Sequence, residues 1–171
     1  MRKLLITLSL LTICMITVAK KYPFDMKHQY RVEQVRVAED GGRFVKAWGV
    51  AGNADKAIIQ ALQDAVACCI FMGLEAKNST TLGHNANAVP SLCPEGLKAY
   101  EEHKAYFDQF FTNGDFLLYA VNSNTRYPTG EDNVKTKGGR QVGIYVVLKV
   151  DQLRKRLEQD GIIKSFENIW E

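Results

Sequence analysis

Histidine and cysteine side chains offer the widest range of chemistry in this sequence, but their spacing matches no known catalytic or metal-binding motif. The three histidines are His28, His84 and His103. A hydrolytic zinc site typically needs two histidines four positions apart with a glutamate between them, and the sequence holds no such segment. His84 and Cys93 are a base and a nucleophile in one segment, but a catalytic pair also needs hydrogen-bond geometry that spacing alone does not supply.

Other sequence signatures of catalysis are missing as well. No serine stands in a G-x-S-x-G elbow, and no glycines form a G-x-G-x-x-G or phosphate-binding loop. No pair of cysteines has the C-x-x-C spacing of redox or zinc sites. The sequence therefore predicts a protein that is not an enzyme and that holds no metal ion or cofactor.

The first 19 residues have the three parts of a secretory signal peptide. Arg2 and Lys3 give a basic start, residues 4–19 carry no charge, and Ala19 ends the run with a small side chain. We expect cleavage after Ala19 and export to the bacterial periplasm or the outer membrane. An uncleaved anchor is the alternative, although a spanning helix needs about 20 apolar residues and this run is shorter.

A lipid anchor on Cys14 is a second alternative. Leu11 fits such a processing site, but Ile13 is larger than the small residue that should precede the modified cysteine. The sequence after Cys14 is again apolar and not a polar tether. We therefore interpret Cys14 as an apolar residue of the signal peptide, while peripheral association with a membrane stays open.

The charge of the exported chain is almost balanced. The full sequence has 22 basic and 19 acidic residues, and residues 1–19 contain two of the basic ones and no acidic one. Residues 20–171 therefore carry a net charge of +1. A charge this small argues against nucleic acid as a partner, because the phosphate backbone selects strongly basic surfaces.

Three cysteines follow the signal peptide, and export would place them where disulfides persist. Cys93 is a candidate to pair with Cys68 or Cys69, which would leave one thiol over. The alternative is that all three are small buried apolar side chains. The sequence does not decide between these two interpretations.

Hydrophobic patterning predicts the elements of the first half of the chain. Residues 30–37 and 44–50 are rich in β-branched and aromatic residues and predict a hairpin. A helix follows, with Asn53 as N-cap and Gly73 at its end. Its inward stripe contains Ile58, Leu62, Ala65, Cys69 and Met72, while Ala57 and Ala61 allow close approach to a sheet.

The middle of the chain has weaker patterns. Residues 77–93 are polar and rich in turn-forming residues, which predicts a long surface loop and a candidate binding site that includes His84 and Asn85. A second helix is predicted from Pro94 to Asn113, with an aromatic face. Residues 116–127 predict a strand, and residues 128–140 a loop with a turn at Gly138 and Gly139.

Residues 141–150 are the clearest strand of the sequence. Val142, Ile144, Val146 and Leu148 alternate on one face. The other face carries Tyr145 and Val147 and is more apolar than a solvated face needs to be. We therefore expect Tyr145 and Val147 either to be covered by a helix or to contact a partner. A last helix, capped by Asp151, ends at Gly161, and an apolar tail follows.

The predicted order β-β-α-α-β-β-α favours an α+β fold with a mainly antiparallel four-stranded sheet and helices packed on one face. The predicted organisation is a signal peptide (1–19), a mobile N-terminal arm (20–29) and a single domain (30–171). No internal repeat or linker divides that domain.

Two stretches carry a resemblance to a known family. The first is VKAWGVAGNADKAIIQALQDAV (45–66), a strand, a glycine turn and a helix with alanines spaced four apart. The second is IYVVLKVDQLRKRLEQDGI (144–162), a strand that passes through an aspartate into a helix. Together they resemble the N-terminal domain of flagellar assembly protein T and related small bacterial envelope lipoproteins. The resemblance implies an α+β domain that serves in envelope assembly without catalysis.

The leading hypothesis from the sequence is therefore a non-enzymatic envelope protein that acts through contacts with another envelope protein. The alternative is a small-ligand or glycan-binding module that uses residues 77–93 and the aromatic helix.

Overall fold

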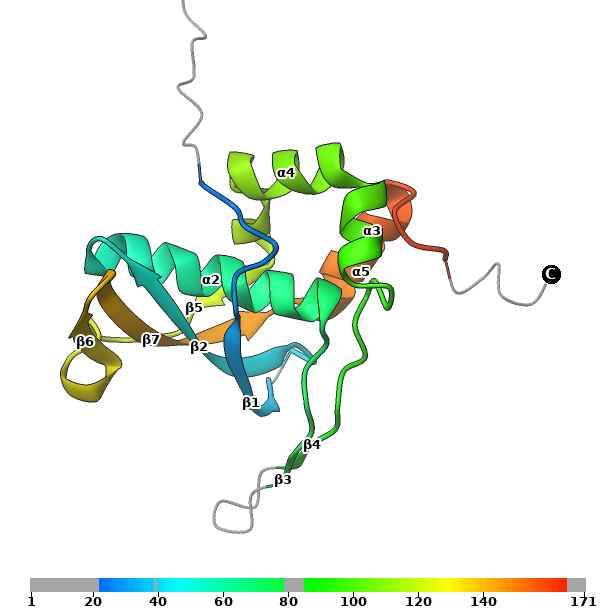
Figure 1. Ribbon diagram of the computed structural model, residues 1–171. Coiled ribbons are helices and arrows are strands. Elements are labelled where there is room, and N and C mark those ends of the chain that lie inside the picture. Colours follow the sequence, from blue (N-terminus) through cyan, green and yellow to red (C-terminus); the bar gives the residue numbers. More distant parts are fainter. Residues whose placement is uncertain (1–21, 39, 79–84, 166–171) are drawn as a thin grey trace, which may run out of the picture.

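Strands β2 and β7 form the centre of one antiparallel sheet, and the helices lie on one side of it (Figure 1). Figure 1 shows the computed structural model, which describes residues 22–38, 40–78 and 85–165. The arrangement confirms the predicted α+β class, with an antiparallel sheet and helices on one face. The strands of this sheet are β1 (Arg31–Val37), β2 (Arg43–Ala51), β5 (Ala120–Asn122), β6 (Asn133–Thr136) and β7 (Gly139–Leu148).

Several sequence predictions fall outside the described residues. They concern the signal peptide at 1–19, the alternative lipid anchor on Cys14, the imidazole of His84 and the apolar tail after residue 165. They stay predictions. Within the described segments, no helix is both long enough and apolar enough to cross a bilayer.

The sheet has a fifth strand that the sequence did not predict. Residues 128–140, predicted as a loop, contain a short 3-10 helix η2 (Gly130–Asp132) and strand β6, which pairs with the first half of β7. β5 pairs with the second half of β7. The turn between β6 and β7 consists of Lys137 and Gly138, one residue earlier than predicted, and Gly139 begins β7 with a φ of +123° that favours glycine. β6 is short, with Lys135 as its one charged residue, and it lies among the mixed charges of residues 131–140, which hide it in the sequence because an edge strand tolerates charged residues.

Helix α2 (Ala54–Phe71) lies along the inner face of the sheet. The Asn53 side chain accepts a hydrogen bond of 2.9 Å from the Lys56 amide, as expected for an N-cap. Ala57 and Ala61 are fully buried against Gly49 of β2. A Cβ atom on Gly49 would overlap with the Ala57 carbonyl oxygen and lie 2.5 Å from the Ala61 amide nitrogen. The helix therefore rests directly on the strand backbone.

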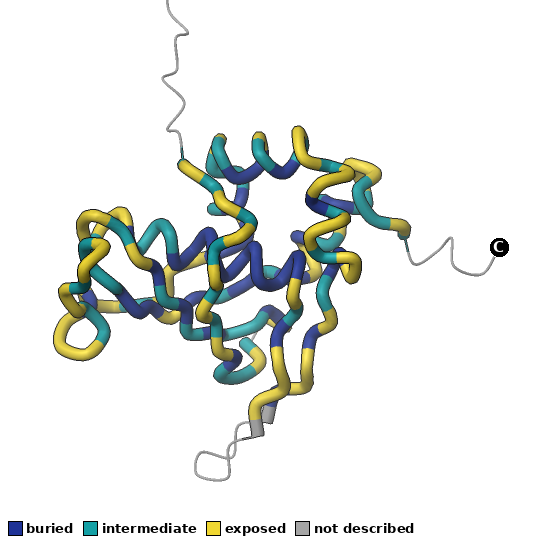
Figure 2. The backbone as a smooth tube through the Cα atoms, in the orientation of Figure 1, coloured by how far each residue is buried: buried dark blue, intermediate teal, exposed yellow. Residues whose placement is uncertain are grey.

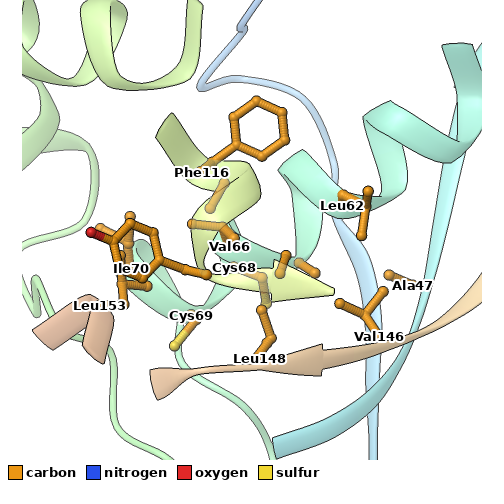
Figure 3. Packing of buried hydrophobic residues seen from close by; sticks show 14 of the residues in the cluster. Ala47, Leu62, Val66, Cys68, Cys69, Ile70, Phe116, Val146, Leu148 and Leu153 are labelled. Atoms are coloured by element: carbon orange, nitrogen blue, oxygen red, sulfur yellow. The ribbon is translucent and has the colours of Figure 1, made fainter. Parts of the chain in front are cut away.

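The core between α2 and the sheet is built from aliphatic side chains (Figure 3). From α2, Leu62, Val66 and Ile70 face Val146 and Leu148 of β7. The predicted inward stripe is confirmed at Leu62, Ala65 and Cys69, but Ile58 is only half-buried and Met72 is 65% exposed. The stripe ends early because the helix stops at Phe71, so Met72 already belongs to the turn at Gly73.

The opposite side of α2 is also covered, by the N-terminal arm and by residues 97–118. The Tyr22 amide donates a 3.0 Å hydrogen bond to the Thr112 carbonyl oxygen, and the Phe24 ring stacks on Phe111 at 3.8 Å. The arm, predicted to be mobile, is therefore in contact with α4 from residue 22 onward. Two aromatic side chains anchor the arm, and their burial outweighs its lack of regular structure.

The aromatic helix after Cys93 is divided in two. Its segments are α3 (Leu97–Glu102) and α4 (Lys104–Asn113), and a 3-10 helix η1 (Asp115–Leu118) follows. His103 interrupts the helix with backbone angles of −110° and 29°. The helix begins at Leu97 and not at the predicted Pro94. The expected aromatic face is confirmed, because Tyr100, Phe107, Phe110 and Phe111 are all buried.

Residues 77–93 do not form the predicted loop without regular structure. They contain a small hairpin, β3 (Lys77–Asn78) and β4 (Asn85–Ala86), and Leu74 bridges Val89 nearer its base. Leu74, Ala86 and Val89 are buried. The apolar residues are too few and too widely spaced to give a strand pattern in the sequence.

The C-terminal elements complete the inner layer. Residues 116–118, predicted as strand, belong to η1, so β5 is shorter than expected. Helix α5 (Val150–Gln159) buries Leu153 and Leu157 and ends before Gly161, which has a φ of +71°. Asp151 lies in its first turn, but no side chain caps it.

The contact between α2 and β2 predicts that Gly49→Ala destabilises the protein. The added methyl group must push α2 off the strand, so we expect the free energy of unfolding to fall by about 1–3 kcal/mol. Gly52→Ala is the matched control, because Gly52 is exposed and its Cβ would meet nothing within 4 Å. Urea denaturation of both variants measures the difference, and an equal stability of the two would contradict direct packing at Gly49.

Candidate functional site

The outer face of the sheet gathers large side chains on the side away from helices α2, α4 and α5, with the short η2 segment beside them (Figure 1). The register places Phe44, Lys46 and Trp48 of β2 opposite Val147, Tyr145 and Gly143 of β7, respectively. On the other side of β2, the same register brings Arg36, Glu33 and Arg31 of β1 opposite these three residues. The helical layer lies on the other face of the sheet (Figure 1). We call these side chains, together with Val121 of β5 opposite Val147, the outer sheet face.

Aromatic rings and cations alternate across the outer sheet face. The Arg31 guanidinium lies 4.0 Å from the centre of the Trp48 ring, and that of Arg36 lies 4.5 Å from the Phe44 ring. The Lys46 ammonium lies 5.1 Å from Trp48 and 5.4 Å from Tyr145. Each exposed contact of this kind stabilises by about 0.5–1 kcal/mol, enough to hold the side chains in a preferred arrangement.

Two of the rings also pack against each other. Phe44 and Tyr145 stack with centres 5.5 Å apart and planes only 7° from parallel. Gly143 lies beneath Trp48, since a Cβ atom there would come within 2.8 Å of the indole nitrogen. The absence of a side chain at Gly143 therefore lets the indole lie down on β7. The result is a row of aromatic side chains across β2 and β7.

The positive charges of the outer sheet face are only partly neutralised. Lys46 forms a 2.7 Å salt bridge with Asp132 of η2, and this hydrogen bond raises the pKa of Lys46. Arg31 has Glu33 nearby at 3.7 Å, with both side chains more than half exposed. Arg36 has no acidic partner among the described residues and donates to the Val37 carbonyl oxygen. The face therefore presents aromatic surface with a small excess of positive charge.

The four predicted binding residues do not form one site. Tyr145 is 36% exposed and Val147 half-buried, and both lie uncovered on the outer sheet face. Asn85 belongs instead to β4 in the projecting hairpin (Figure 1), beyond the β1 side of the sheet. His84 lies outside the described residues. The alternating pattern of side chains in residues 141–150 is the sequence signal that predicted Tyr145 and Val147 as binding residues.

One buried polar cluster was not predicted from the sequence. Asp64 on α2 is fully buried, and its Oδ2 atom lies 3.2 Å from Nε2 of His28 on the arm. Its other oxygen, Oδ1, accepts a 2.7 Å hydrogen bond from the Gln60 amide. Burial is the main cause that raises the pKa of Asp64, to about 6, while Gln60 and His28 oppose the rise. Pairing across 36 positions leaves no trace in sequence spacing.

This histidine–aspartate pair lacks a nucleophile among the described residues near it. Cys68 is the closest candidate, but burial raises the pKa of its thiol to about 11. A thiol with that pKa stays protonated at neutral pH and attacks poorly. Tyr30, which packs edge-on against His28, also has its pKa raised by burial. The pair therefore pins the arm to α2.

The three cysteines are free and buried. Cys68, Cys69 and Cys93 form no disulfide in the structure, so the proposed pairing of Cys93 with Cys68 or Cys69 is not present. The Cys93 amide donates to the Ile70 carbonyl oxygen at 2.7 Å, which fixes this segment beside the end of α2. Burial raises the pKa of Cys93 to about 11 and that of Cys69 to about 12. The thiols thus act as apolar packing groups.

Comparisons with known proteins add no relative. Searches of family models, of curated proteins and of solved structures give no match to this chain. The resemblance to the N-terminal domain of flagellar assembly protein T therefore stays a prediction from two stretches of sequence. Within the described residues, no three histidine, cysteine or acidic side chains gather as metal ligands would.

The buried Asp64 predicts a specific pH dependence of stability. Its folded pKa of about 6 lies above the ordinary value of about 3.9 in the unfolded chain. The folded protein therefore holds the proton more tightly, and this contribution to stability is complete below about pH 4 and is lost as the pH rises through 6. Relative to Asp64→Asn, the wild type should lose about 1–3 kcal/mol of unfolding free energy between pH 4 and pH 7.

Urea denaturation at four pH values between 4 and 7 measures this difference. His28→Ala provides a second test, because losing the imidazole removes a group that favours the carboxylate and should move the loss of stability to higher pH. A pH-independent difference between wild type and Asp64→Asn would show that the carboxyl is not buried.

The free thiols predict the outcome of thiol titration. In guanidinium chloride without reductant, Cys68, Cys69 and Cys93 should all react with Ellman's reagent. In the native protein the same thiols should react slowly, because they are buried and protonated. If only one of these three reacts in denaturant, Cys93 has formed the disulfide that the sequence suggested.

Proposed function

We propose that this protein is an exported envelope protein without catalytic activity, which binds another envelope protein through the outer sheet face. The observation that carries the proposal is the uncovered row of Trp48, Phe44 and Tyr145 with cations over their rings. Tryptophan, tyrosine and arginine are the residues most enriched at the centres of protein interfaces. Export itself rests on the pattern of residues 1–19.

The arrangement of the face favours a protein partner over a small molecule. Small ligands need concave sites that enclose most of their surface. The outer sheet face instead spreads its aromatic side chains over neighbouring strands of one sheet, where Phe44 and Tyr145 stack on each other. Its side chains are also held in place by their mutual contacts, so little conformational entropy is lost when a partner binds.

The charges on the face indicate the chemistry of that partner. Arg36 has no acidic neighbour among the described residues, and Arg31 has only an exposed one. A partner surface with carboxylates around an apolar centre would match both the rings and the excess positive charge. A role in assembling a surface structure is the part of the proposal that rests on the sequence resemblance alone.

Photo-crosslinking in intact cells tests the proposal. A benzophenone amino acid at position 145 should give a discrete adduct with one envelope protein. The same amino acid at Leu118, which is 60% exposed in η1 on the helical side, should not give it. Adducts at neither position, or the same adduct at both, would contradict a specific interface on the outer sheet face.

Substitution then measures the energy of the contact. Tyr145→Glu should weaken binding of the crosslinked partner at least tenfold, because it removes an aromatic ring and places a negative charge against an acidic surface. Leu118→Glu is the matched control and should leave the affinity unchanged. Both variants should keep the melting temperature of the wild type within a few degrees, since both positions are exposed.

A further inference from the structure

A second candidate site lies on the helical side of the molecule, between the N-terminal arm and the first half of α2. The two segments enclose a groove of about 490 Å³, a size typical of small-molecule sites. Its lining includes the apolar residues Tyr22, Pro23, Ala51 and Ile59. The groove exists because η1 and α4 cover only part of α2: its second half is buried, while its first half is partly exposed (Figure 2).

One buried polar group in this groove has no partner. Gln63 lines the groove and is only 2% exposed, yet its Nε2 atom has no acceptor among the described residues. A buried amide without a hydrogen bond costs about 1–3 kcal/mol. Such a cost in an otherwise well-packed helix requires an explanation, and an acceptor supplied by a ligand is one.

The orientation of the Gln63 amide is fixed by its neighbours. The Asp64 carboxylate accepts from the Gln60 Nε2 atom at 2.7 Å, and this directs the Gln60 amide. The same Gln60 nitrogen donates to Gln63 Oε1 at 3.1 Å. The Gln63 oxygen is therefore occupied, and the free end of its amide has to be the N–H donor. This donor lies within the wall of the groove and is shielded from solvent, so an acceptor bound in the groove reaches it by displacing the side chains that shield it.

A cation lies at the same groove. Lys56, in the first turn of α2, lines it and is exposed, and its ammonium contacts no acidic side chain among the described residues. Asp55, the acidic residue in the lining, already accepts a 2.9 Å hydrogen bond from the Tyr127 hydroxyl. An amide donor and a free ammonium beside apolar walls match a molecule that combines an apolar body with a carboxylate.

From this juxtaposition we propose that the groove binds a small aliphatic carboxylate, with its chain along Ile59 and Tyr22 and its carboxylate held by Gln63 and Lys56. This site is separate from the outer sheet face, which lies across the sheet from α2, so either proposal can fail without the other.

Binding of octanoate to the purified protein tests the inference, with 1-octanol and octylammonium as probes of equal chain length. Octanoate should bind with a dissociation constant below about 1 mM and shift the NMR signals of Ile59 and Tyr22. The alcohol should bind about tenfold more weakly and the ammonium should not bind, since the recognised group is the carboxylate.

Variants of single side chains test which residues recognise the carboxylate. Gln63→Met keeps the side-chain length and removes the donor, so it should weaken octanoate binding about tenfold without lowering the melting temperature, because it also removes an unsatisfied buried group. Lys56→Gln should reduce the preference for octanoate over octanol. Lys77→Gln, an exposed lysine on β3, is the control and should change nothing.

Three results would overturn the inference. The first is no binding of octanoate at 10 mM, and the second is equal binding of octanoate and octanol. The third is octanoate binding that both Gln63→Met and Lys56→Gln leave unchanged.

Discussion

The burial of α2 on both of its sides is the constraint on which the rest of the structure depends. The sheet takes one side of the helix, where Gly49 lets the backbones approach closely and Leu62, Val66 and Ile70 fill the space beyond. The other side is covered by the arm and by aromatic side chains of residues 97–118. In the second half of the helix, where every residue is buried, a polar group needs a partner within the protein because water does not reach it.

Two polar features of the molecule follow from that enclosure. Asp64 is buried by the arm, and it is held by His28 from the arm and Gln60 from its own helix. Gln63 is oriented through Gln60 and keeps one donor unsatisfied beside the groove. The arm is therefore more than a connection from the N-terminus to β1: it supplies both the partner of the buried carboxylate and one wall of the groove. The outer sheet face stays free for a related reason, because the arm and the other α-helices lie on the same side of the sheet as α2 (Figure 1).

Local and regular signals in the sequence were enough to predict most of the fold. Asn53 and Gly73 bound the main helix, and the alternation of residues 141–150 separated the buried side chains from Tyr145 and Val147. Weak or irregular patterns in the sequence did not predict the structure of their segments. The short length of Asn133–Thr136 and the charged residues around it concealed an edge strand, and the sparse apolar residues between Leu74 and Val89 concealed a hairpin. Nothing in the aromatic pattern after Pro94 announced the interruption at His103.

The sequence by itself determined the class of the fold, the inner and outer faces of β7 and the aromatic face of residues 97–111, because these depend on periodicity within one element. Only the tertiary structure decided that His28 meets Asp64, that Arg31 lies over Trp48 and Arg36 over Phe44, and that the amide of Gln63 has no acceptor. These contacts join residues of different elements, or depend on which side chains are shielded from water. Strand register and the path of the arm determine these contacts and this shielding. Neither the register nor the path can be predicted from the spacing of residues along the chain.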